Sequence, residues 1–157
     1  MSQEIIEKFY SSFQKKDINS MLECYHKDVE FSDPIFQLNG WKANAMWMML
    51  IDRGKDMELS YGSVEGDDKT GKAKWEAKYT FSKTGNKIHN QISATFEFKE
   101  GKIIKHKDSF DLWKWCSMAL GLKGLLFGWL PMIQNEIRRE ANSGLELYIK
   151  RKKLKPE

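Results

Sequence analysis

Three side chains that can carry protons, Asp33, His106 and Asp108, stand where a strand pattern would turn them toward the protein interior. Between Gly101 and Trp115 (GKIIKHKDSFDLWKW), His106 and Asp108 share alternate positions with apolar residues, and alternate residues of a strand lie on one face. An ionised carboxylate on an apolar face is costly unless it is paired, hydrated or next to a cavity. The pattern therefore predicts a general acid or base at Asp108, with a structural carboxylate bonded to backbone amides or a tyrosine as the alternative.

His106 and Asp33 each allow a functional and a structural interpretation. His106 lies two residues from Asp108, where it would orient the carboxylate or share a proton with it, but a core histidine bonded to a carbonyl gives the same pattern. Asp33 shares a face with Val29 and Phe31 in a short strand, yet aspartate before proline is also an ordinary residue at a strand end. Both remain candidate catalytic residues beside Asp108.

Further side chains are predicted to line a ligand pocket: Tyr61, Trp75, Tyr79, Asn90, Trp41 and Phe110. The neutral polar groups among them would donate hydrogen bonds to a ligand, or would satisfy the buried acids instead. The tryptophans would wall an apolar pocket, although most large aromatic residues in a domain of this size belong to the core.

Composition indicates one domain without a nucleic-acid surface. A chain of 157 residues with 41% hydrophobic content can bury one sizeable core. The net charge of +4 is accounted for by the tail 150–157, which carries five basic residues and one acidic residue. The electrically balanced remainder offers no broad phosphate-binding face, so the tail is expected to aid solubility or to touch an anionic surface weakly.

Neither a metal nor a cofactor is predicted. Cys24 and Cys116 lack the spacing of a metal knuckle and the density of a disulfide scaffold, so they are expected to be free thiols. Of the three histidines, His26 and His89 are expected outside the core, and no phosphate loop, nucleophile elbow or dinucleotide fingerprint is visible. The polar N-terminus MSQEIIEKFYSSF lacks the apolar core of a signal peptide, which predicts a cytoplasmic protein.

Hydrophobic periodicity predicts the elements that must position these side chains. Helical spacing covers residues 3–15, a shorter helix capped by Asp17 with a stripe through Tyr25, and residues 41–51. Strand alternation covers residues 28–33, 57–66, 72–82, 88–99 and 101–115. This order predicts an α+β fold in which a conical, curved antiparallel sheet wraps over the N-terminal helices.

The C-terminal third adds helices to this domain. Residues 112–133 are largely apolar but contain Lys114 and Lys123, which disfavours a membrane span. An amphipathic helix that packs on the sheet, covers the cavity mouth or builds a homodimer is expected instead, followed by a helix from Pro131 to about Lys150. The expected division is a cone domain at 1–115, a helical extension packed on it at 116–150 and a basic tail at 151–157.

Two local motifs resemble the nuclear transport factor 2-like superfamily, which includes ketosteroid isomerases, epoxide hydrolases and SnoaL-like polyketide cyclases. In DVEFSDPIF the resemblance to the isomerases makes Asp33 the base, and in HKDSFDLW the resemblance to the hydrolases and cyclases makes Asp108 the acid/base residue. The isomerase tyrosine falls near Phe9, with Tyr10 one place away on a different helical face, and the isomerase partner acid falls near Ala94. The resemblance therefore favours Asp108 over Asp33.

The leading functional prediction is a SnoaL-like protein that binds a small apolar carbonyl or polycyclic compound. It would act as a cofactor-free isomerase, cyclase or hydrolase, with Asp108 as base, His106 as its partner and Asp33 as second acid. One alternative is a non-catalytic ligand-binding or dimerisation module of the same fold. Another is a peripheral membrane protein that uses the apolar C-terminal helix and the basic tail.

Overall fold

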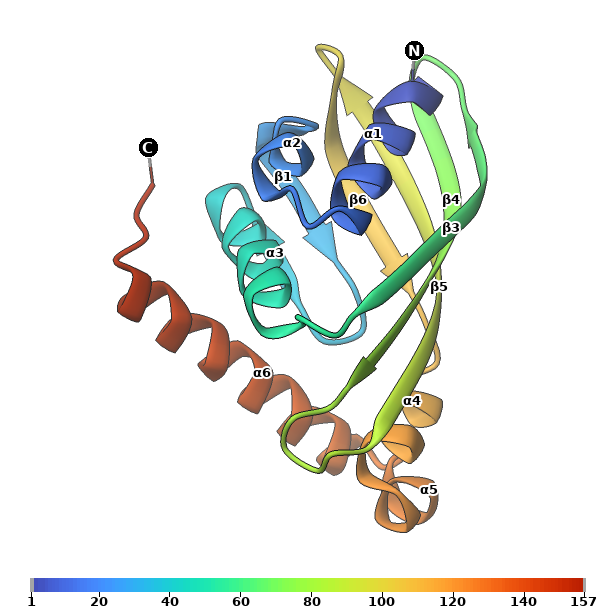
Figure 1. Ribbon diagram of the computed structural model, residues 1–157, viewed down its shortest axis with the longest axis vertical. Coiled ribbons are helices and arrows are strands. Elements are labelled where there is room, and N and C mark those ends of the chain that lie inside the picture. The colour runs from blue at the N-terminus through green and yellow to red at the C-terminus, as the bar shows by residue number, and fades with distance from the viewer. Residues whose placement is uncertain (1, 157) are drawn as a thin grey trace.

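A computed structural model describes residues 2–156, which form six helices and six strands (Figure 1). The helices are α1 Ser2–Gln14, α2 Ile18–Leu22, α3 Trp41–Arg53, α4 Leu112–Leu120, α5 Leu122–Phe127 and α6 Pro131–Lys152. The strands are β1 Tyr25–Ser32, β2 Gln37–Asn39, β3 Glu58–Gly66, β4 Thr70–Thr80, β5 Lys87–Lys99 and β6 Lys102–Ser109. The predicted α+β class is confirmed: a curved, unclosed sheet wraps around α1 (Figure 1).

The strand order β2-β1-β6-β5-β4-β3 explains how distant segments meet. The strands β3 to β6 form the predicted antiparallel meander. However, β1 runs parallel to β6, a pairing that the expectation of an antiparallel sheet did not include, and it places Phe31 opposite His106. On the other side of β6, Ala94 of β5 lies opposite Asp108. The predicted acid/base pair therefore lies on a central strand of the sheet.

The stretch 101–115 differs from the predicted single strand in two ways. The strand β6 ends at Ser109 and the side chain of Asp111 then caps α4 by accepting a hydrogen bond from the Lys114 amide at 3.1 Å, so the prediction of a strand as far as Trp115 is wrong. The register also shifts next to Phe98, and this irregularity leaves Ile103 instead of Ile104 in the core.

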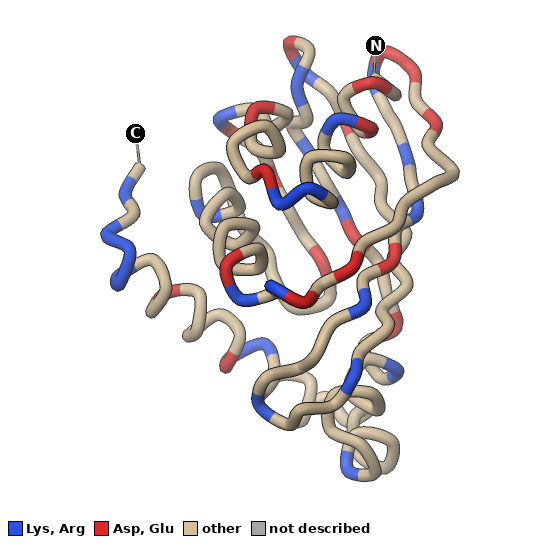
Figure 2. Tube along the Cα trace, in the orientation of Figure 1, with Lys and Arg blue, Asp and Glu red and all other residues tan. Residues whose placement is uncertain are grey.

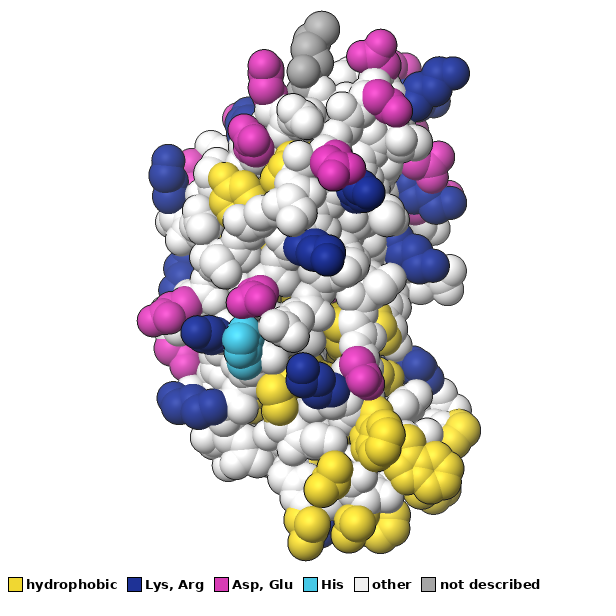
Figure 3. Space-filling model, turned by 90° about the vertical axis from the view of Figure 1, so that its right-hand side faces the viewer, with side chains coloured by type: hydrophobic (Ala, Val, Ile, Leu, Met, Phe, Trp, Pro, Cys, Tyr) yellow, Lys and Arg dark blue, Asp and Glu magenta, His cyan; other side chains and the backbone are white. Residues whose placement is uncertain are grey.

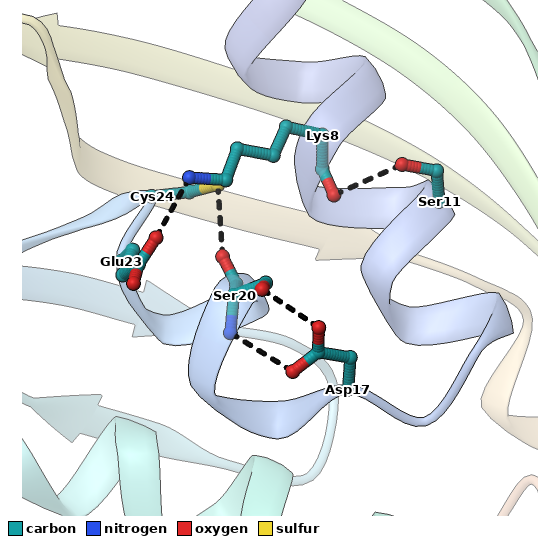
Figure 4. Close-up of polar contacts among 6 residues, drawn as sticks. All are labelled: Lys8, Ser11, Asp17, Ser20, Glu23 and Cys24. Atoms are coloured by element: carbon teal, nitrogen blue, oxygen red, sulfur yellow. Dashed lines mark hydrogen bonds and ion pairs between the residues drawn. The ribbon is translucent and has the colours of Figure 1, made fainter.

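The start of the short second helix was predicted correctly, but its end was not. Asp17 caps α2, because its carboxylate accepts hydrogen bonds from the amide and hydroxyl of Ser20 at 3.2 and 2.7 Å (Figure 4). The ion pair of Lys8 with Glu23 at 2.8 Å joins α1 to the residue after α2 (Figure 4). Tyr25 was assigned to the apolar stripe of this helix, but it begins β1, and β2 was not predicted.

The helix α6 closes one side of the domain. Its C-terminal half buries Leu145, Tyr148 and Ile149 in the same core as α1, α3 and the sheet. Closer to its start, Arg138 donates a hydrogen bond from Nε to the carbonyl of Pro34 at 2.7 Å. In Figure 1, α6 crosses beside α3 and carries the chain away from the α4–α5 end of the molecule. No helix within residues 2–156 is long and apolar enough to cross a membrane.

Candidate functional site

His106 and Asp108 meet inside the cone as an enclosed hydrogen-bonded pair. Nε2 of His106 lies 2.9 Å from Oδ1 of Asp108, and their side chains are 0% and 3% exposed. Both point to the concave side of β6, as the alternation of this strand predicted. Trp75 on β4 donates a second hydrogen bond from Nε1 to the same Oδ1 at 3.3 Å.

The pair forms the end of a chain of four hydrogen-bonded side chains, in which each donor can point toward Asp108. Trp47 on α3 can only donate, and its Nε1 lies 2.9 Å from the hydroxyl of Tyr25. That hydroxyl can then donate to Nδ1 of His106 at 2.7 Å, which leaves Nε2–H to donate to Asp108. The arrangement fits a neutral imidazole and an ionised carboxylate. We call Trp47, Tyr25, His106 and Asp108 the interior chain.

Aromatic rings exclude water from this chain. The imidazole of His106 lies with its centroid 4.4 Å from the ring of Phe96 and 5.1 Å from that of Phe31. Phe9 of α1 contacts the same imidazole edge-on at 5.5 Å, and Trp47 stacks on it at 6.0 Å. In such an environment of low dielectric constant each hydrogen bond of the interior chain is strong, and each missing one is costly.

Tyr10 adds an unpaired hydroxyl beside the interior chain. Tyr10 and Phe9 are both fully buried, and they pack against different neighbours: Phe9 lies against His106, whereas Tyr10 lies against Tyr61. The Tyr10 hydroxyl has no hydrogen-bond partner among residues 2–156. Burial raises the pKa of Tyr10 well above its usual range, and the negative charge of Asp108 raises it further. Tyr10 therefore remains a neutral donor that points into the interior.

Asp33 lies at the edge of the same interior, just after β1. Its Oδ1 accepts hydrogen bonds from the amides of Ile35 and Phe36 at 2.7 and 2.6 Å, so the turn-forming interpretation of this residue is correct for one oxygen. Burial raises the pKa of Asp33 to about 6, with a smaller contribution in the same direction from Asp108 and opposing contributions from the two amides. The carboxyl group of Asp33 thus titrates near neutral pH and senses the charge of Asp108.

The predicted pocket residues do not all gather at Asp108. Trp75 contacts it directly, and Tyr61 on β3 stacks on Tyr10 with ring centroids 5.5 Å apart. Tyr79 accepts a hydrogen bond from Nε1 of Trp115 at 2.9 Å and therefore joins β4 to α4.

The remaining three pocket candidates lie in different surroundings. Asn90 is buried on β5 opposite Ala77. Phe110 packs between the main core and the smaller cluster around α4. Trp41, at the start of α3, is partly exposed and has the ammonium group of Lys42 5.9 Å from its ring centroid.

Two hollows on the described surface, about 780 Å³ each, lie away from the interior chain. One is lined by polar and charged residues where the turn between β3 and β4 meets the outer face of β5 and β6, and the other follows the C-terminal half of α6. Neither is lined by Asp33, His106 or Asp108. The ligand pocket beside these residues therefore stays a prediction.

Two of the interior residues, Tyr25 and Trp47, were not identified as site residues from the sequence. The alternation that would mark Tyr25 as inward is interrupted by a register shift between Tyr25 and Glu30. Trp47 was assigned to the core because a Met- and Trp-rich helix is typical of core packing. His26 was expected outside, but it is buried and lies 3.1 Å from Glu100. No cluster of metal-ligating side chains occurs within the described range 2–156.

The fold defines the class first: the order and pairing of the strands are those of an α+β protein with the nuclear transport factor 2-like fold. The chain belongs to the SnoaL-like domain family, whose sequence profile matches residues 6–106, more than half of the 157 residues. The matched segment includes Asp33 and His106 and ends two residues before Asp108. No match was found among curated protein sequences.

Several solved structures share the fold. TerC, crystallised with polyporic acid, is 16% identical, with a TM-score of 0.64 over 75% of this chain and 97% of TerC. A putative polyketide cyclase from Pseudomonas putida is 17% identical, with a TM-score of 0.63 over 76% of this chain and 98% of that protein. An LEH-like epoxide hydrolase of M. tuberculosis is 16% identical, with a TM-score of 0.63 over 82% and 94%. At these identities the likeness establishes the fold.

Proposed function

We propose that this SnoaL-like protein binds a small, mostly apolar carbonyl or polycyclic compound and moves a proton on it without a cofactor. Asp108 is the base, His106 its positioning partner and Asp33 a second acid. The observation that carries the proposal is the interior chain, which holds one oxygen of Asp108 in a fixed position among aromatic rings.

The second oxygen of Asp108 is the atom available for chemistry. Both hydrogen bonds from His106 and Trp75 go to Oδ1. The side chain of Asp108 is 3% exposed, so Oδ2 would meet a ligand only inside the cone. An oxygen held in place but left free can accept a proton from a carbon next to a carbonyl group.

Asp33 and Asp108 would divide the acid and base roles. The pKa of about 6 at Asp33 leaves part of this group protonated near neutral pH, so it can return a proton. Asp108 receives two N–H donors, which match an ionised carboxylate. The buried hydroxyl of Tyr10 lies close enough to sense the charge of Asp108 and would donate to an oxygen of the ligand. The ligand class is consistent with TerC, which was crystallised with polyporic acid.

The test follows deuterium exchange at carbons next to a carbonyl across a panel of apolar ketones and quinones. Because general-base catalysis contributes about 100-fold or more, Asp108→Asn is expected to lower the exchange rate by at least that factor. Asp68→Asn, on the exposed turn before β4, is the matched control and is expected to leave the rate unchanged. If Asp108→Asn leaves every detected exchange rate unchanged, Asp108 is not the base.

A second candidate function is a non-catalytic ligand carrier, favoured by the tight aromatic packing around His106. In that case the interior chain would serve stability, and the ligand would be held without turnover. Native mass spectrometry of the purified protein checks both for a co-purified ligand and for the homodimer that the sequence predicted. Tight binding that Asp108→Asn does not alter, with no exchange detected, would favour the carrier.

A further inference from the structure

The end of the molecule formed by α4, α5 and the start of α6 presents apolar side chains to water. Those that are at least half exposed lie within eleven residues: Leu122, Leu125, Leu126, Phe127, Trp129 and Met132. Figure 3 shows hydrophobic side chains gathered at this end of the molecule, while charged side chains are spread over the rest of the same face among smaller hydrophobic patches. We call residues 112–133 the apolar tip. A patch of this kind is typical of a surface that is covered by a partner in use.

The apolar tip holds its side chains outward by close backbone packing. A Cβ added at Gly124 would lie 1.9 Å from the carbonyl oxygen of Cys116, and one added at Gly128 would lie 2.6 Å from Cβ of Cys116. These two glycines therefore allow α5 to press against α4. With its inner face filled by backbone, α5 can only direct its large side chains away from the domain.

The backbone carbonyls at the end of α5 are hydrogen-bonded within the protein and do not need water as a partner. At the end of α5, the carbonyls of Leu125 and Leu126 accept hydrogen bonds from the indoles of Trp113 and Trp129, both at 3.0 Å. The carbonyl of Gly124 accepts a hydrogen bond from the amide of Gly128, and the carbonyl of Phe127 accepts one from the amide of Leu130. The carbonyl of Gly128 accepts one from the side chain of Gln134. Five consecutive carbonyls are thus satisfied internally, although a helix end in water can leave them to solvent. A helix end in lipid cannot.

The charges of the apolar tip have one sign. No acidic residue occurs from Leu112 to Asn135, and this segment carries Lys114 and Lys123. Figure 2 shows basic positions and no acidic ones along α4 and α5. Lysines beside exposed tryptophan and leucine side chains are typical of segments that lie in the interface of an anionic membrane.

We propose that the apolar tip inserts its apolar side chains into the boundary between the headgroups and the acyl chains of an anionic lipid bilayer and holds the protein at that surface. An apolar contact with a second copy would bring Lys114 and Lys123 of both copies together, whereas anionic headgroups neutralise them. The basic tail takes no part in this contact, because it begins at the other end of α6, whose 22 residues span about 33 Å. The sequence had grouped the tail and the apolar helix into one anchor.

The test is flotation of the full-length protein with vesicles of phosphatidylcholine alone and of phosphatidylcholine with phosphatidylglycerol. We expect binding to the anionic vesicles, at least tenfold weaker binding for the double variant Leu126→Gln/Phe127→Gln, and about fivefold weaker binding for Lys123→Gln. Leu147→Gln is the matched control, because Leu147 is 49% exposed on α6 outside the tip. Substituting Arg151, Lys153 and Lys155 by glutamine is expected to leave binding unchanged.

Two results would overturn the proposal. One is vesicle binding that the tip variant and the Leu147 control weaken equally, or that is absent from the start. The other is a dimer in sedimentation equilibrium without lipid that the Leu126→Gln/Phe127→Gln variant dissociates, since the tip would then bind a second copy. Circular dichroism of the variants checks that the fold is retained. Loss of proton transfer in Asp108→Asn leaves this proposal untouched, because Asp108 lies on β6 and is not part of the tip.

Discussion

The interior chain and the apolar tip use the same kinds of residue in opposite ways. Around His106, aromatic side chains enclose polar side chains, and the polar groups are bonded to each other. In the tip, tryptophan side chains enclose polar backbone groups, and the apolar surface faces water. In both places the hydrogen-bonding requirement is met inside the protein. The orientation of a tryptophan side chain therefore depends on the hydrogen-bond partner of its indole N–H as well as on the burial of its apolar ring.

The two regions should therefore have different roles: the interior aromatic residues stabilise the fold, and the exposed residues of the tip are available for interaction. The interior aromatics are buried against α1, α3 and the sheet, so they should contribute most of the folding free energy in their region. The exposed side chains of the tip bury little area in the folded protein and should contribute little. The comparison predicts different costs for the same substitution in the two regions.

The largest expected effect comes from truncating one phenylalanine in each region. Phe9 on α1 is fully buried and Phe127 on α5 is 50% exposed. Phe9→Ala should lower the free energy of unfolding by about 3–5 kcal/mol, because it removes buried area and leaves a cavity. Phe127→Ala should cost less than about 1 kcal/mol. Urea denaturation followed by circular dichroism measures both, and equal losses would contradict the division between the two regions.

The sequence predicted the parts of the site that depend on local pattern. His106 and Asp108 are two residues apart on one strand, so the period of the strand alone placed them side by side. Asp17 marked a helix start through its side-chain carboxylate, and Pro131 marked another through its fixed backbone angle. The curved sheet over α1 followed from the order of helices and alternating strands.

The rest of the site depends on contacts between distant segments. Tyr25 meets His106 across 81 residues because β1 pairs with β6, and a single sequence carries no signal for that pairing. Register shifts in β1 and at the β5–β6 pairing also break the alternation from which inward positions are predicted. In the tip, composition showed an apolar stretch, but the contact of Gly124 with Cys116 decides that its side chains point outward.

The second expected effect concerns Asp33, which lies between the enclosed interior and the surface. Its folded pKa of about 6 is above the ordinary 3.8, so the folded state keeps its proton to higher pH than the unfolded state does. The contribution of Asp33 to stability is therefore fully present below about pH 4 and is lost as the pH rises through 6. At about 1.4 kcal/mol per pKa unit, the loss is at most about 3 kcal/mol.

Asp33→Asn isolates this contribution, because asparagine keeps an acceptor for the amides of Ile35 and Phe36 but does not titrate. The difference in unfolding free energy, wild type minus variant, should fall between pH 4.5 and 7 and stay level from 7 to 8. Urea denaturation at each pH measures it. A difference that rises over this range would mean that Asp33 is stabilised as a carboxylate and is not the second acid.

The smallest of these effects tests whether the interior depends on its hydrogen bonds or on its aromatic packing alone. Tyr25→Phe keeps the ring but leaves N–H of Trp47 without an acceptor and Nδ1 of His106 without a donor, which should cost about 1–3 kcal/mol. Tyr61→Phe is the control, because it keeps the ring that stacks on Tyr10 and removes a hydroxyl from a side chain that is only partly buried, so it should cost about 0.5 kcal/mol or less. If the two variants are equally stable in urea, packing alone holds His106 in place. In that case the interior would differ from the tip only in burial, and the interior chain could not be what positions Asp108.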